Sequence, residues 1–299
     1  MTAVDVQAVK PKARKPVSRN ALVLRRLKRR PQFWVGLVVV VLLMAWALFG
    51  NLFNVYGPTD QDIMALSSPP SAQHWFGTDA IGQDLYARMI EGLRKSLLIG
   101  LVAGPAATLI AALIGSAAGY LGGKFESVVN WIISLFLVLP SFYVLMVVSP
   151  LLSALGWVVI VFFIAAFGWM IMAQIVKNQT KSLREREFVK AARYMGVGTF
   201  TTLTRHIIPN VASLLIIDAA LGVSYAILAE TSLSFFGLGI QPPDTSLGTL
   251  LSDGQPAAVT RPWLFVFPAA VLVILLTAIN LIGDALRDAI DPTSEVNRA

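Results

Sequence analysis

Long, uninterrupted runs of apolar residues constrain the fold of this chain more than any other feature of its sequence. Six runs share this character: 33–53, 97–118, 128–148, 157–176, 211–236 and 263–283. The hydrocarbon core of a bilayer is about 30 Å thick, and a helix needs about 20 apolar residues to cross it. Only 14% of the residues are charged, too few to cover the surface of a soluble protein of this length. The sequence therefore predicts an all-α, polytopic membrane protein with six transmembrane helices.

Basic residues are concentrated where they predict the orientation of these helices. Ten of the 24 lysines and arginines lie in the first thirty residues, and the 177–210 loop holds seven basic residues against two glutamates. The 239–262 loop is slightly acidic. Because basic loops stay in the cytoplasm, we expect both termini and the 177–210 loop to be cytoplasmic. The basic arm then meets anionic lipid headgroups, and no nucleic-acid partner is expected.

Four parts of the chain follow from this reading. Residues 1–32 form a basic cytoplasmic arm, and 33–94 contain the first span and an extracytoplasmic loop with an interfacial helix from about Gln83. Residues 95–290 form a five-helix core, and 291–299 a cytoplasmic tail. Pro105, Pro140 and Pro268 lie inside spans and predict kinks. Asp284, Asp288 and Asp291 form an acidic stripe that either pairs with the basic loop or is solvated.

Two acids, Asp218 and Glu230, lie within one predicted span. Charged side chains at this depth are costly, so they usually face protein or a water-filled path. Twelve residues apart on a helix, they are rotated by about 120° and do not form one ion-binding pair. We expect Asp218 to be the more buried and Glu230, near the outer end, to meet water. Each is either a pathway or gate residue or a hydrogen-bonded structural acid.

The sequence contains no cysteine, and His74 and His206 fall on opposite sides of the membrane, so no metal site is expected. Gly122-Gly123-Lys124 resembles part of a phosphate loop, but Ala118 replaces its first glycine and Phe125 its Ser/Thr. We therefore expect no bound cofactor and no ATP hydrolysis by this chain. It is not predicted to be an enzyme.

The 182–196 segment within the cytoplasmic loop predicts a short amphipathic helix. Phe188, Ala191, Ala192 and Met195 fall on one face, whereas Arg186, Lys190 and Arg193 fall on another. Gly196 and Gly198 are expected to end the helix. Such a helix either lies in the groove of a soluble partner or rests on the lipid surface.

This segment resembles the coupling loop of ABC-importer permeases, a Glu-Ala-Ala element followed by glycine and then Leu-Pro. Ala191-Ala192, Gly196 and Ile208-Pro209 match, whereas Lys190 stands at the glutamate position with Glu187 one turn earlier. Further blocks resemble the C-type permease subunit of dipeptide, oligopeptide and nickel importers. They are His74–Asp79 with Gly82 and Asp84, Arg184–Phe188, Arg205–Asn210, Ile227–Gly239, Gln241–Pro243 and Gly283–Pro292.

The resemblance implies the type I permease fold of ABC importers and a place in the inner membrane of a bacterium. It further implies a second, homologous permease, two ATPase subunits that hold ATP and Mg, and an extracytoplasmic peptide-binding protein. The ATPase-coupling residues would be Glu187, Phe188, Lys190, Ala191, Ala192, Gly196 and Pro209. The residues facing the binding protein would be Trp75, Asp79, Gln241 and Asp253.

The main alternative is an ion-coupled secondary transporter, which requires paired intramembrane charges and usually inverted repeats. Neither is evident in the sequence, nor is the side-chain constellation of an intramembrane enzyme. Dipeptides, oligopeptides, nickel complexes and haem remain open as substrates. The Gln241–Pro243 and Arg184–Phe188 blocks favour oligopeptides.

Overall fold

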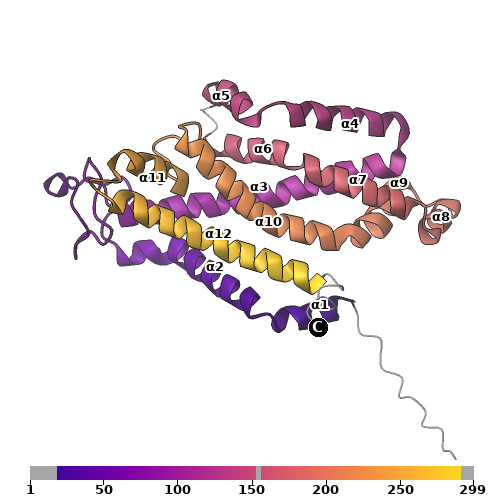
Figure 1. Cartoon of the computed structure of the whole chain (residues 1–299), viewed down its shortest axis with the longest axis horizontal. Coiled ribbons are helices and arrows are strands. Elements are labelled where there is room, and N and C mark those ends of the chain that lie inside the picture. The colour runs from indigo at the N-terminus through magenta and orange to yellow at the C-terminus, as the bar shows by residue number, and fades with distance from the viewer. Residues whose placement is uncertain (1–18, 153–155, 291–299) are drawn as a thin grey trace, which may run out of the picture.

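The structure, a computed structural model, describes residues 19–152 and 156–290, and within these ranges it consists of helices without a β-strand (Figure 1). The all-α prediction is confirmed. The 291–299 tail and Asp291 lie outside the described residues. The α-helices are α1 (Arg19–Lys28), α2 (Pro31–Phe49), α3 (Leu85–Leu121), α4 (Gly123–Val138), α5 (Ser141–Leu152), α6 (Trp157–Gly168), α7 (Met170–Arg184), α8 (Glu187–Tyr194), α9 (Thr199–Thr202), α10 (Ile208–Phe235), α11 (Leu247–Gly254) and α12 (Trp263–Ile290).

Four continuous helical stretches are long and apolar enough to cross a membrane: Pro31–Phe53, Leu85–Leu121, Thr199–Phe235 and Trp263–Ile290. Two further candidates are bent pairs. Helices α4 and α5 meet at 82°, and α6 and α7 meet at 40°. When each pair is counted as one span, the total is six, the number that the apolar runs predict.

The bend between α4 and α5 occurs at Pro140. Proline has no N–H to donate and its ring clashes with the preceding turn, so a helix cannot continue through it without distortion. The kink predicted at Pro140 is therefore confirmed. Pro105 and Pro268 instead lie inside α3 and α12, and neither helix is interrupted.

Helix α3 is longer than the sequence predicts. The expected interfacial helix and the second span form one continuous helix of 37 residues, which at 1.5 Å per residue is about 55 Å long. The Asp84 side chain begins this helix by accepting a hydrogen bond from the backbone N–H of Ala87, at 2.8 Å. Because the bilayer core is only about 30 Å thick, the first turns of α3 extend beyond it.

Small residues let α3 pack closely against two neighbours. A Cβ added at Gly119 would clash with the Lys177 carbonyl oxygen on α7, and one at Gly104 would lie 2.5 Å from the backbone of Gly222 on α10. Close backbone approach at small residues is typical of membrane helices. Helix α3 thus forms the centre of the bundle, with α7 and α10 against it.

The two ends of the bundle differ in content (Figure 1). The 54–84 loop and α11 lie at one end, whereas α1, α8 and α9 lie at the other. Arg30 forms an ion pair with Asp288 near the end of α12, with 3.2 Å between Nη1 and Oδ2. One acid of the predicted stripe, Asp288, therefore contacts the residue that precedes α2.

Candidate functional site

Helix α8 forms where the amphipathic pattern predicts it. It ends in a Schellman motif, in which Val197 N–H donates to the Ala192 carbonyl and Gly196 N–H to the Arg193 carbonyl, both at 3.0 Å. Gly196 has φ +78°, a conformation that favours glycine. The predicted helix end at Gly196 is confirmed, whereas Gly198 precedes α9 as its N-cap.

The exposed face of α8 differs from the predicted one at one residue. Val189 and Ala192 are buried against the chain itself, because α8 packs between α7 and α9. Ala192 therefore does not face outward with the other apolar residues. Phe188, Ala191 and Met195, spaced i, i+3 and i+7, form an exposed apolar line, with Phe188 44% and Met195 77% exposed.

The remaining coupling candidates surround this line. Lys190 pairs with Glu185 at 3.2 Å, and Arg184 contacts the same carboxylate at 3.3 Å. These hydrogen bonds, from Lys190 first and then Arg184, lower the pKa of Glu185. Glu187 is exposed in the first turn of α8, and Pro209 lies in the first turn of α10. Lys190 is thus engaged within the chain.

A cavity of about 750 Å³ opens at the opposite end of the bundle, between the 54–84 loop and the segment around α11. Asp79, Gln241 and Asp253 line it, so the fold brings together three of the four residues predicted to face a binding protein. Trp75 does not line this cavity. Its ring packs at 4.9 Å from that of Tyr86 and is half exposed.

Two basic residues of α3 hold the segments around this cavity in place. The Arg88 guanidinium contacts Asp79 and Asp253, each at 2.9 Å, and Lys95 contacts Asp244 at 2.9 Å. Asp253 nevertheless remains 57% exposed at its side chain. Its carboxylate can therefore meet a partner while it is bound to Arg88.

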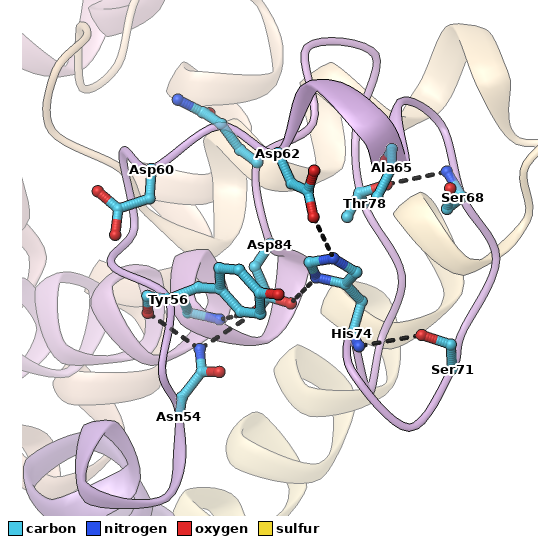
Figure 2. A network of polar contacts seen from close by, with 12 residues as sticks. Asn54, Tyr56, Asp60, Asp62, Ala65, Ser68, Ser71, His74, Thr78 and Asp84 are labelled. Carbon is cyan, nitrogen blue, oxygen red and sulfur yellow. Dashed lines mark hydrogen bonds and ion pairs between the residues drawn. The ribbon is translucent and has the colours of Figure 1, made fainter.

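Sequence reasoning missed a buried network that ties the 54–84 loop to α3 (Figure 2). His74 Nδ1 lies 2.9 Å from Asp84 Oδ2, and the His74 ring lies against the ring of Tyr56, tilted by 31° with 4.5 Å between the ring centroids. Asp62 lies 3.5 Å from His74 Nε2 on the other side. No group of three potential metal ligands is found among the described residues. Asp84 also caps α3, so the network fixes the loop at that helix start. The only signal for it in the sequence is a capping residue before the helix.

The two intramembrane acids occupy the opposite environments from those predicted. Glu230 is fully buried, accepts hydrogen bonds from Ser234 at 2.6 Å and Ser96 at 3.3 Å, and meets no water-filled surface. Ser96 also accepts a hydrogen bond from the N–H of Leu247 at 3.2 Å. Glu230 thus joins α3, α10 and the start of α11. Its face of α10 is covered by both neighbours, which the sequence alone does not reveal.

Asp218 is the more accessible of the two acids. It accepts a hydrogen bond from Thr108 of α3 at 2.6 Å and lines a second cavity, of about 430 Å³, among the membrane-spanning helices. The two acids therefore differ in kind. Glu230 has the surroundings of a structural acid, whereas Asp218 borders open space.

Comparison with known proteins provides the family. Residues 111–296 match the family described as the binding-protein-dependent transport system inner membrane component. The chain belongs to this family. Residues 18–70 match the N-terminal transmembrane domain of oligopeptide transport permease C.

Relatives with similar names align along nearly the whole chain. The oligopeptide transport system permease protein OppC of Mycobacterium tuberculosis H37Rv is 48% identical over 278 residues, covering 93% of this chain and 96% of its own. A putative peptide permease of Brucella suis is 40% identical over 285 residues, covering 94% and 93%. OppC of Bacillus subtilis is 36% identical over 258 residues, covering 86% and 84%.

Family membership makes this chain a multi-pass permease component of an ABC import system in the inner membrane. The alternative of an ion-coupled secondary transporter has no support among the relatives. For a permease component, the exposed line along α8 and the cavity of about 750 Å³ are candidate contact surfaces for other components. They lie at opposite ends of the bundle (Figure 1).

Proposed function

We propose that this chain is one of two permease subunits in an ATP-driven importer of oligopeptides. The names of the relatives support a peptide substrate. The observation that carries the coupling role is the exposed apolar line Phe188, Ala191 and Met195, along α8 and its C-cap, at the end of the bundle away from the cavity of about 750 Å³. A short helix with an exposed apolar line suits the groove of a soluble partner.

The partners follow from the two ends. A second, homologous permease completes the pathway, and two ATPase subunits that bind ATP and Mg take up α8 and its counterpart on the cytoplasmic side. An extracytoplasmic peptide-binding protein docks over the outer cavity. Both termini of this chain are cytoplasmic, as is α8.

Movement of α8 would reach the membrane through its two connections. Helix α7 ends at Arg184 and is separated from α8 by two residues, and α9 leads through the π-helical turn Leu203–Ile207 into α10. A pull on α8 therefore acts on α7, which is already bent against α6, and on α10, which carries Asp218. We propose that these helices tilt when ATP closes the ATPase pair, so that the pathway opens alternately to either side.

Delivery by the binding protein is expected to depend on the outer surface. Asp253→Ala removes an exposed carboxylate, and Trp75→Ala removes a half-exposed ring. We expect either variant to raise severalfold the concentration of loaded binding protein that gives half-maximal uptake, without reducing the amount of assembled complex. Val259→Ala, at a residue 95% exposed that does not line the cavity, is the matched control. An unchanged half-maximal concentration in both test variants would show that the binding protein does not dock on this surface.

Reconstitution tests the proposed function directly. Proteoliposomes that contain this chain, its partner permease and the ATPase subunits should take up oligopeptides only with both ATP and the loaded binding protein. Uptake by this chain alone, driven by an ion gradient, would contradict the proposal. Co-purification of the ATPase subunits with this chain is the corresponding binding measurement.

A further inference from the structure

The cavity beside Asp218 is apolar except at a few positions. Its walls come from α3, α4, the start of α5, α6, α7 and α10, and include Phe136, Phe167 and Met172. Among the lining residues, all of them within the described part of the chain, Asp218 alone has a charged side chain. Ionisable side chains within membrane spans are costly and usually serve the function of the protein.

The Asp218 carboxylate is only partly engaged. Its Oδ2 accepts the hydrogen bond from Thr108, whereas Oδ1 has no hydrogen-bond donor among the described residues. Glu230 differs, because Ser234 donates to one of its oxygens and Ser96 to the other. Asp218 therefore retains the capacity to accept a further donor, and this donor would come from the cavity.

Both bent helix pairs meet at this cavity. Leu139 and Ser141 line it at the bend between α4 and α5, and Gly168 and Met170 line it at the bend between α6 and α7. The last carbonyl groups of α4 lack donors within the helix, and Pro140 has no N–H to offer them. The C-terminal end of a helix carries partial negative charge. The α4 end and Asp218 thus both favour a positively charged group in this space.

We infer that this cavity is a transit site for a primary ammonium group, which Asp218 receives during import. The inference rests on the proposed function, because a peptide brings such a group as its free amino terminus or as a lysine side chain. An ammonium ion is costly to transfer from water into an apolar space unless a negative partner meets it. Asp218 supplies this partner, while the apolar walls accept neutral side chains.

Charge-selective labelling tests the site. The chain contains no cysteine, so Ser141→Cys places a single thiol in the cavity wall. The assembled complex, in nanodiscs accessible from both sides, is treated with cationic and anionic methanethiosulfonates of similar size, and labelling of this chain is measured. We expect the ratio of cationic to anionic labelling rates to fall about tenfold when Asp218→Asn is added. Asp218→Glu should preserve the ratio, and an unchanged ratio with Asp218→Asn would overturn the inference.

Protection by peptides identifies the source of the ammonium group. Tetra-alanine with a free amino terminus should slow labelling of Ser141→Cys, and N-acetyl-tetra-alanine should not. Protection by an acetylated peptide that contains lysine would assign the side chain as a second source. Equal protection by the free and acetylated tetra-alanine, or by sodium chloride at the same ionic strength, would refute an ammonium site.

The inference and the proposed function fail in distinguishable ways. If the reconstituted wild-type complex imports no peptide but the labelling ratio still depends on Asp218, the proposed function is wrong and the negative site remains. If uptake is normal but the ratio ignores Asp218, the function stands and the inference fails. Size-exclusion chromatography of each variant complex confirms assembly before labelling.

Discussion

Phe188→Asp is expected to reduce ATP-driven uptake by at least about tenfold, while this chain remains inserted in the membrane. Phe188 is 44% exposed on the apolar line of α8, so the chain itself tolerates a polar side chain there. In the groove of an ATPase subunit, the new carboxylate would lose its water without gaining a partner. We expect co-purification of the ATPase subunits to fall in parallel with uptake.

The matched control lies on the same helix. Tyr194→Asp makes the same aromatic-to-acid change at a residue that is 89% exposed but outside the line of Phe188, Ala191 and Met195. It should retain most of the uptake and of the bound ATPase. Ala191→Trp provides a second test, because Ala191 is exposed and a larger side chain there meets a partner before it meets the chain. Equal uptake by Phe188→Asp and Tyr194→Asp would show that the apolar line does not couple this chain to the ATPase.

Glu230→Ala is expected to cause a large loss of stability. The substitution leaves the hydroxyls of Ser96 and Ser234 without their carboxylate partner in a fully buried site. A buried polar group that loses its partner costs about 1–3 kcal/mol, so two such groups cost on the order of 2–6 kcal/mol. The measurement is the apparent melting temperature of the solubilised complex, followed by size-exclusion chromatography.

Glu230→Gln separates a structural role from a gating role. Glutamine keeps an acceptor oxygen and the shape of the side chain. The melting temperature of Glu230→Gln should therefore lie much closer to that of the wild type than to that of Glu230→Ala, and uptake should be retained. If Glu230→Gln is stable but inactive, the charge itself serves transport and Glu230 is a gate residue. If Glu230→Ala melts like the wild type, the hydrogen-bonded junction among α3, α10 and α11 contributes little.

The overall architecture could be predicted from the sequence because lipid imposes simple lengths. A span requires about 20 apolar residues, and basic loops indicate orientation, so six spans follow from local composition. Helix α8 could also be predicted from nearby residues alone. The pattern of apolar and basic residues defines its faces, and Gly196 defines its end. The full length of α3 could not be predicted from nearby residues alone. Leu85, Met89 and Gly92 in its first turns are buried beneath α11, at Leu247 and Leu250, which lie far along the chain.

The environments of individual side chains could not be predicted, because they depend on which helix covers which face. Asp218 and Glu230 lie on one helix at similar cost to insertion, yet Ser96 and Ser246 enclose Glu230 and a cavity borders Asp218. The same holds for Ala192, which the helical pattern groups with Phe188 but which faces α8's own neighbours. The interior of the 54–84 loop around His74 left no periodic signal at all.

The position of α8 relative to the membrane tests the account most directly. Tyr194→Cys and Val259→Cys each introduce one thiol at a highly exposed residue of a cysteine-free chain. Tyr194 belongs to α8, and Val259 to the segment that follows α11; α8 and α11 lie at opposite ends of the bundle (Figure 1). The measurement is labelling of this chain by a membrane-impermeant maleimide in intact cells and in inverted vesicles stripped of peripheral proteins. We predict that Tyr194→Cys is labelled only in the vesicles and Val259→Cys in intact cells. Labelling of Tyr194→Cys in intact cells would place α8 outside and contradict its coupling to a cytoplasmic ATPase.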